Sequence, residues 1–381
     1  MISADFPAPW AHAAGRALDD LVAGRMVVVK RDALEQETLA AFVVAGASIT
    51  PDHLQLMGRL GGDILWVALG RQRADFLNLV EIRSDRPGQQ PATLTPIDLR
   101  QTTGLTLADR AATIRALAST DKGPADFMRP GHIFPVVVDE RQVLLGRPNI
   151  PEAAVELLRL SGQQAVVAGS MLMSQGGQPS EVDDIDRVAA AEGFTVVRTS
   201  DIALYAMAMN TLLEPGAVTS IPVAGHVFRV QGFRSMVDAH TCVALIRGEL
   251  SGRNSVPVYL HRYSTVGDVF QSNECDCFDS LRRALSELEA MPAGVLIYLV
   301  SYSPESLGIS HGKGCQHPWS PYETAIAAHV LRNLGPRSVV LATPELADTA
   351  TLIAIAGGAA INAVPLAGPA PLKAGDTIGR D

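Results

Sequence analysis

The stretch His261–Cys277 reads HRYSTVGDVFQSNECDC and contains two cysteines, Cys275 and Cys277, separated by one residue. Two thiols at this spacing can share one soft metal ion, but zinc in proteins takes four ligands, and a catalytic site leaves one of them to water. The stretch therefore predicts half of a zinc site that needs ligands from elsewhere. His261 and Asp268 are candidates for acid–base work, or else a satisfied strand histidine and a turn-fixing carboxylate.

Short apolar strands and amphipathic helices surround this stretch. Before it, Val227–Val230 and Cys242–Ile246 alternate in the manner of paired antiparallel strands, which puts Cys242 in the core. After it, Gly294–Val300 is typical of a buried strand. The remaining elements expected in this half are helices over 279–289 and 323–334 and a strand over 338–341.

The first half of the chain alternates β-branched runs with helical stretches. A break follows between residues 211 and 222, where 212–216 is expected to end a helix and Ile221 to open a strand-rich section. We therefore expect an α+β (α/β-like) protein with two domains, residues 1–213 and 214–381. The elements expected before the break are helices over 17–23, 106–117 and 151–160 and strands over 26–29, 166–167 and 194–197.

Composition excludes several classes of protein. The chain has 381 residues, 47% of them hydrophobic, and a net charge of −9, which argues against nucleic acid or an anionic membrane as the main partner. Four cysteines are too few for a disulfide framework in a chain of this size. The start has no basic and apolar signal segment, so we expect a cytoplasmic protein. The uncharged stretch 349–372 is interpreted as helix, turn and strand.

The cysteine-containing stretch resembles the zinc loop of GTP cyclohydrolase II, H-S-E-C-L-T-G-D-V-F followed after a short spacer by C-D-C. His261, Gly267–Phe270 and Cys275–Cys277 fit this pattern. The resemblance implies the fold of that family, a zinc cofactor and a small-molecule nucleotide or related heterocycle as substrate. The flanking matches to the family are residues 228–230, 243–248, 294–299 and 330–335.

The first half resembles 3,4-dihydroxy-2-butanone 4-phosphate synthase. The matching segments are Ala17–Val29, Thr102–Gly104 with Ala108–Arg110, Arg129–Pro135 and Glu152–Glu156. That domain is fused ahead of GTP cyclohydrolase II in the bifunctional riboflavin-biosynthesis family, so nearly the whole chain is covered. The resemblance implies a homodimer-like assembly, and a heteromer with a paralogue is expected if the chain is an assembly partner.

The second half departs from the family at residues that the reaction needs. Ser264 stands where the family has its first zinc cysteine, and a hydroxyl is a far poorer zinc ligand than a thiolate. Residues 302–309 replace a loop that contains an arginine, and Ser320 and Tyr322 fall at the positions of an aspartate and the nucleophilic arginine. The family's own cyclohydrolase site is therefore expected to be incomplete, with Tyr322 as a candidate replacement.

The first half departs in a similar way. The acidic metal-binding loop of the synthase aligns with residues 36–41, where only Glu37 remains. The metal-binding histidine falls at Ile150 and a late catalytic glutamate at Ser170, and hard cations need oxygen ligands. We therefore expect no magnesium and no synthase activity. The candidates for substrate binding are the remaining matches Glu37, His132 and Arg147, with Thr103 beside them and Thr343 in the second half.

A remodelled segment offers replacements for the missing zinc ligand. Cys315, together with His311 or His317, would complete a tetrahedral site with Cys275 and Cys277. The alternative is that the two thiols are relics packed as small apolar side chains.

Three functional hypotheses follow. The first is an altered cyclohydrolase, a hydrolase of the C–N bonds of a cyclic amidine, in which a rebuilt zinc site acts on a purine-like or pterin-like heterocycle through metal-activated water. The second is a non-catalytic nucleotide-binding regulator or assembly partner of an active paralogue, which explains the losses in both halves. The third is ordinary GTP cyclohydrolase II activity that survives through unrecognised substitutions.

Overall fold

The computed structural model describes residues 8–32, 39–61, 65–82, 91–146, 148–173, 182–223, 226–272, 275–300, 319–342, 355–356 and 360–362. The chain divides into two compact units, Met1–Asn210 (unit 1) and Thr211–Asp381 (unit 2). No helix in the described ranges is both long enough and apolar enough to cross a membrane.

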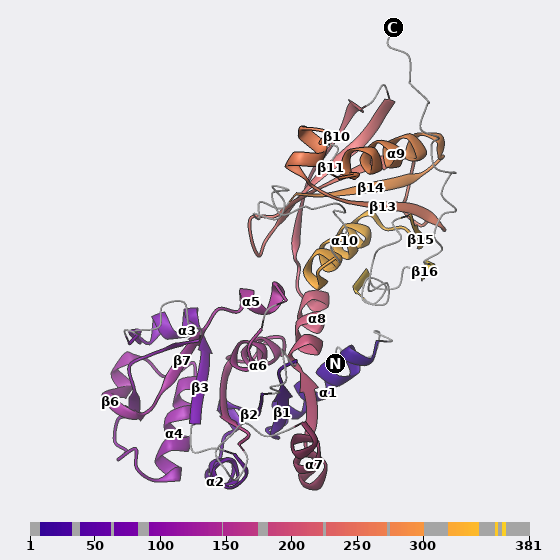
Figure 1. Cartoon of the computed structure of the whole chain (residues 1–381). Coiled ribbons are helices and arrows are strands. Elements are labelled where there is room, and N and C mark those ends of the chain that lie inside the picture. The colour runs from indigo at the N-terminus through magenta and orange to yellow at the C-terminus, as the bar shows by residue number, and fades with distance from the viewer. Residues whose placement is uncertain are drawn as a thin grey trace. The chain divides into compact units, whose positions relative to one another are not determined.

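A mixed seven-stranded sheet forms the centre of unit 1 (Figure 1). Its strand order is β4-β7-β3-β8-β2-β1-β9, with β1 parallel to β9, β3 parallel to β7, and the other neighbours antiparallel. The strands are β1 (Val27–Lys30), β2 (Ala40–Ala45), β3 (Leu65–Gly70), β4 (Ala92–Thr93), β7 (Pro135–Val138), β8 (Val166–Met171) and β9 (Thr195–Arg198).

Helices cover both faces of this sheet, and β2 is therefore buried at every position along its length. One layer is formed by α1 (Pro9–Val22), α6 (Ile150–Arg159) and α8 (Thr199–Met209), which pack on one another, and another by α2 (Pro51–Leu60) and α4 (Leu107–Ala118). A separate two-stranded sheet pairs β5 (Ile97–Leu99) with β6 (Phe127–Ile133). The remaining elements are η1 (Gly46–Ser48), α3 (Arg71–Phe76), η2 (Pro124–Asp126), α5 (Arg141–Leu144) and α7 (Val182–Glu192).

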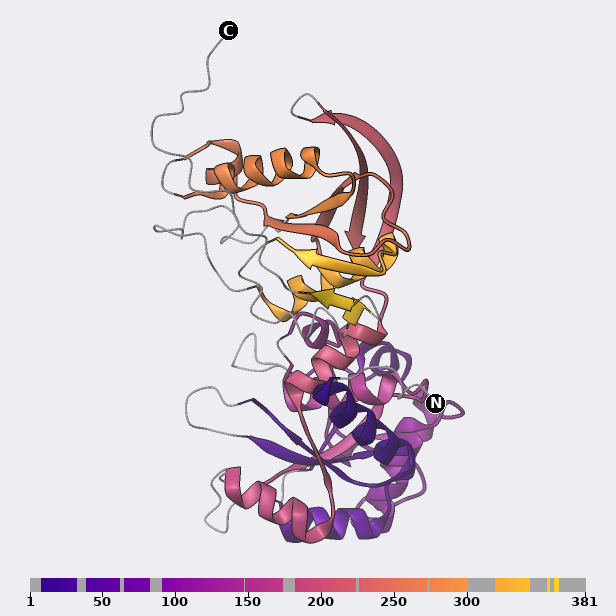
Figure 2. The same ribbon diagram turned by 90° about the vertical axis from the view of Figure 1, so that its right-hand side faces the viewer.

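Unit 2 is built on a second seven-stranded sheet, in the order β10-β11-β12-β14-β13-β15-β16. Its first half is antiparallel, while β13 lies between β14 and β15 and is parallel to both. Helices α9 and α10 lie on opposite sides of the sheet (Figure 2). The elements are β10 (Leu213–Val223), β11 (His226–Ser235), β12 (Thr241–Arg247), β13 (Val256–Arg262), η3 (Thr265–Val269), α9 (Cys277–Ala290), β14 (Gly294–Val300), α10 (Pro321–Leu334), β15 (Ser338–Leu341) and β16 (Ala360–Asn362).

The α+β architecture expected from the sequence is confirmed. The strands predicted over 294–300 and 338–341 have those bounds, and Val230 pairs with Leu245 in the predicted antiparallel arrangement. The prediction that 212–216 ends a helix is wrong, because α8 already ends at Met209 and the strand β10 begins at Leu213. Pairing with β11 overrides the turn signal of Pro215 and Gly216, which fall at an irregularity in the register.

Candidate functional site

Cys275 and Cys277 pack against a single glycine. A Cβ added to Gly267 would lie 2.6 Å from Cβ of Cys277, 2.8 Å from Sγ of Cys275 and 3.1 Å from Oγ of Ser264. Only glycine leaves room for this approach. The fold therefore gathers the predicted thiol pair and Ser264 around one point, where the π-helical turn η3 meets the start of α9.

Ser264 already has a structural role at this point. Its hydroxyl oxygen caps η3 by accepting a 3.0 Å hydrogen bond from the backbone N–H of Gly267. Its own backbone N–H donates to Oδ2 of Asp268 at 3.0 Å. The Ser264 side chain is thus used to close the turn.

Asp268 is the centre of a buried polar network. Its carboxylate lies 3.0 and 3.1 Å from Nε2 of His261, and its Oδ2 accepts a 2.6 Å bond from the hydroxyl of Tyr298. The side chains of His261 and Asp268 are only 9% and 5% exposed. Burial alone would raise the pKa of Asp268, but the contacts with His261, Tyr298 and Ser264 outweigh it and lower that pKa. The contact between the two catalytic candidates thus joins the loop to β13.

The described residues do not form a complete metal site. In the described ranges no three His, Cys, Asp or Glu side chains stand close enough together to hold a metal ion. The two thiols are of the type that zinc prefers, and Ser264 adds only a hydroxyl. His311, Cys315 and His317, the predicted additional ligands, lie outside the described residues.

Tyr322, the third catalytic candidate, is buried at the start of α10. Its hydroxyl bonds with Oγ of Ser235 at 2.9 Å and donates to Oδ1 of Asp238 at 3.0 Å. Burial raises the pKa of Tyr322, while the pKa of Asp238 falls to about 2 because bonds from His240 and Ser235 outweigh its burial. Sequence reasoning missed this cluster, for which the only signal was an aspartate and a histidine in the turn between β11 and β12.

The start of α10 also contacts the end of β13. Arg262 donates to both carboxylate oxygens of Glu323, at 2.7 and 2.9 Å, and its guanidinium lies 5.0 Å from the ring centroid of Trp319. Glu323 also accepts the backbone N–H of Ser320, which caps α10 in return. Sequence patterns did not predict this pair.

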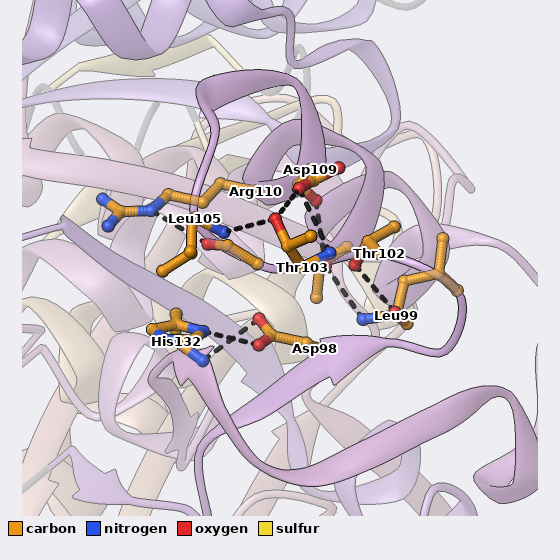
Figure 3. A network of polar contacts seen from close by, with 10 residues as sticks. Asp98, Leu99, Thr102, Thr103, Leu105, Asp109, Arg110 and His132 are labelled. Carbon is orange, nitrogen blue, oxygen red and sulfur yellow. Dashed lines mark hydrogen bonds and ion pairs between the residues drawn. The ribbon is translucent and has the colours of Figure 1, made fainter.

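In unit 1 the structure gives His132 a buried partner (Figure 3). Nδ1 of His132 lies 2.6 Å from Oδ2 of Asp98, and the backbone N–H of His132 donates to Oδ1 at 3.0 Å. The imidazole is 45% exposed, whereas the Asp98 side chain is 5% exposed. A buried carboxylate thus orients an accessible imidazole, an arrangement suited to binding or proton transfer.

The neighbouring turn is held by Thr103 and Asp109, which also appear in Figure 3. The hydroxyl and the backbone N–H of Thr103 both donate to Oδ2 of Asp109, at 2.5 and 3.2 Å, and the hydroxyl bond lowers the pKa of that carboxyl. Arg110 bonds weakly to the carbonyl of Gly104. The other candidates for substrate binding, Glu37, Arg147 and Thr343, lie outside the described residues.

Two positions of the synthase pattern lie inside the core. Ile150, the first residue of α6, is 3% exposed, and Ser170 in β8 is 1% exposed. An isoleucine side chain cannot bind a hard cation, and this position is closed to solvent. The Ile150 position therefore offers no ligand to a magnesium ion.

Comparisons with known proteins match the two halves of the chain to two different families. The family model of 3,4-dihydroxy-2-butanone 4-phosphate synthase matches residues 15–205, and that of GTP cyclohydrolase II matches residues 216–355. The riboflavin biosynthesis protein RibBA of Salinispora arenicola is 32% identical over 299 residues, which cover 78% of this chain and 71% of that protein.

Two further relatives extend the match. A probable bifunctional riboflavin biosynthesis protein, RIBA 2 of Oryza sativa, is 28% identical over 89% of this chain but only 65% of its own length, so the chain spans less than two thirds of that protein. The crystal structure of RibBX, a two-domain 3,4-dihydroxy-2-butanone 4-phosphate synthase from A. baumannii, has a TM-score of 0.68 at 23% identity and covers 92% of this chain and 99% of that one. That likeness shows a shared fold. The chain belongs to the family of bifunctional riboflavin-biosynthesis proteins, with a dihydroxybutanone-phosphate-synthase-like domain followed by a GTP-cyclohydrolase-II-like domain.

Proposed function

We propose that unit 2 is a GTP-cyclohydrolase-II-type hydrolase that opens a C–N bond of a purine-like or pterin-like heterocycle with the help of zinc. The observation that carries the proposal is the convergence of Cys275 and Cys277 on Gly267, which places two good zinc ligands at the head of α9. Zinc would supply a Lewis acid that activates water for attack on the ring.

The remaining ligands are proposed to come from outside the described ranges. Cys315 and either His311 or His317 supply the thiolate and imidazole that a tetrahedral site with an N/S ligand set needs. Asp268 keeps the loop closed, and the Arg262–Glu323 pair fastens the neighbouring helix. Thr343 is proposed to contact the substrate.

Unit 1 is proposed to bind a small molecule without performing the synthase reaction. The burial of Ile150 and Ser170 supports this proposal, because these positions would have to present a metal ligand and an acid–base group. His132, which Asp98 orients, is the leading binding group, with Glu37 and Arg147 as further contacts.

The proposal is tested by the zinc content of the purified, tag-free protein. Elemental mass spectrometry of wild type, Cys275→Ser and Cys315→Ala should give about one zinc per chain in wild type and almost none in either variant. Cys242→Ala is the matched control, because Cys242 is buried in β12, and this variant should keep its metal. A wild-type protein without zinc would refute the proposal. Formate release from GTP would identify the ordinary cyclohydrolase reaction.

A non-catalytic assembly partner is the second candidate. The structural contacts of Ser264 and Tyr322 favour it. The Ser264 hydroxyl caps η3, and the Tyr322 hydroxyl is bonded to Ser235 and Asp238, so neither hydroxyl needs a metal or a substrate as its partner. This candidate predicts no zinc, no turnover and a stable heteromer with a catalytically complete relative. Analytical ultracentrifugation of the chain alone and mixed with such a relative separates a homodimer from a heteromer.

A further inference from the structure

We propose that Asp268 is a positioning residue that holds Cys275 and Cys277 in their mutual arrangement before any metal binds. The inference deepens the proposed function of unit 2 and rests on it for the role of the two thiols as zinc ligands. Its geometric basis lies entirely in the contacts of the metal-free loop.

Asp268 joins three separate parts of unit 2. His261 contacts it from β13, Tyr298 donates to it from β14, and the backbone N–H of Ser264 donates to it from the loop itself. The rings of His261 and Tyr298 also stack, with centroids 5.3 Å apart and planes inclined by 19°. The carboxylate therefore clamps the loop to two adjacent strands of the sheet.

The clamp acts on the residue against which the thiols pack. Gly267 immediately precedes Asp268, so fixing the Asp268 side chain also fixes the backbone at Gly267. Sγ of Cys275 and Cβ of Cys277 both rest on that backbone.

The contacts of the clamp offset the cost of burying the Asp268 carboxylate. A buried carboxylate is unfavourable unless donors satisfy it, and Asp268 has three of them. Removing the charge weakens all three contacts together and frees the loop, while the rest of the sheet keeps its own pairing. The effect should consequently appear at Cys275 and Cys277 and not in the core.

The experiment measures thiol alkylation in the reduced, chelator-treated full-length chain, with peptide mass spectrometry resolving each cysteine. Asp268→Asn should raise the alkylation rates of Cys275 and Cys277 about tenfold, because local opening now exposes them. Tyr298→Phe, which keeps the carboxylate and removes one donor, should give a smaller rise at the same two sites. Cys242 is the internal reference for global unfolding and should stay unreactive.

Asp276→Asn is the matched control, because Asp276 is an exposed carboxylate between the two thiols and contributes no side-chain bond to the helix that follows. This variant removes a negative charge beside the two thiols and leaves the contacts of Asp268 unchanged. The alkylation rates of Cys275 and Cys277 should therefore stay within about threefold of wild type. Wild-type rates in Asp268→Asn, an equal rise at Cys242, or an equal rise in Asp276→Asn would each overturn the inference. Zinc content is measured separately, so a chain with protected thiols and no zinc would refute the proposed function alone.

Discussion

Gly104 lies so close to Asp98 that a Cβ on the glycine would stand 2.2 Å from Oδ2 of the carboxylate and 2.5 Å from Nδ1 of His132. Its backbone also has φ +71°, a conformation that L side chains rarely adopt. The contact between His132 and Asp98 thus exists because residue 104 has no side chain.

Gly104→Ala is expected to lower the free energy of unfolding by more than about 2 kcal/mol, since left-handed strain alone is worth 1–2 kcal/mol and the added methyl also displaces Asp98. Urea denaturation measures the loss, and the imidazole resonances of His132 report the displacement. Gly162→Ala is the control, because Gly162 has φ +77° and a Cβ there meets nothing within 4 Å. Equal losses in the two variants would show that crowding at Asp98 is unimportant.

Arg73 is a buried arginine that stabilises the end of α4. It donates to the carbonyl oxygens of Leu117 at 2.9 Å, Ser119 at 2.6 Å and Lys122 at 3.2 Å, and burial lowers its pKa. Arg73→Met leaves these carbonyls unsatisfied and should destabilise the protein by about 3 kcal/mol in chemical denaturation.

The control for this prediction is Arg71→Met. Arg71 forms a half-exposed ion pair with Glu81, at 2.6 Å. Its loss should change the free energy of unfolding by less than about 1 kcal/mol. A similar loss in both variants would contradict the role assigned to the buried guanidinium.

Glu152 makes the stability of unit 1 dependent on pH. The residue is fully buried, and neither carboxylate oxygen has a partner at hydrogen-bond distance in the described part of the chain. Burial raises its pKa above 4.5, and the nearby backbone N–H of Glu152 and the Asn149 side chain oppose this rise only in part. Because unfolding restores an ordinary acid, the wild type loses stability as pH rises above 4.5 towards the raised pKa.

Glu152→Gln removes this dependence. The variant should match the wild type near pH 4 and exceed its free energy of unfolding by more than about 1 kcal/mol at pH 8, as urea denaturation across that range would measure. Glu156→Gln provides the contrast, since Glu156 is equally buried but bonded to Arg159 and Asn210, and it should destabilise. A constant difference between Glu152→Gln and wild type across this range would contradict the prediction.

Cys242 is expected to be inert in the folded protein. It is 1% exposed, and burial raises its pKa from 9.0 to about 12, so almost no thiolate forms at pH 8. Iodoacetamide should label it only when urea unfolds the chain, which peptide mass spectrometry detects. Labelling of Cys242 at the rate of Cys275 in native buffer would disprove its burial.

Local patterns were sufficient to predict much of the architecture. The strands over 294–300 and 338–341 and the core position of Cys242 follow from apolar runs and alternation, which neighbouring residues determine by themselves. They were insufficient at 213–216, where proline and glycine indicate a turn but pairing with β11 forms a strand. The thiol pair was evident from its spacing, whereas the serine that caps η3 appeared only as a substituted ligand.

The sequence by itself determined the family, the order of the two domains and the loop that contains Cys275 and Cys277, because each is recorded in residues close together along the chain. Only the tertiary structure showed that Asp268 meets Tyr298, Asp98 meets His132 and Arg262 meets Glu323, over separations of 30, 34 and 61 residues. The physical reason is that such contacts depend on strand order, register and burial. These properties follow from the packing of the whole unit, and no short segment contains them.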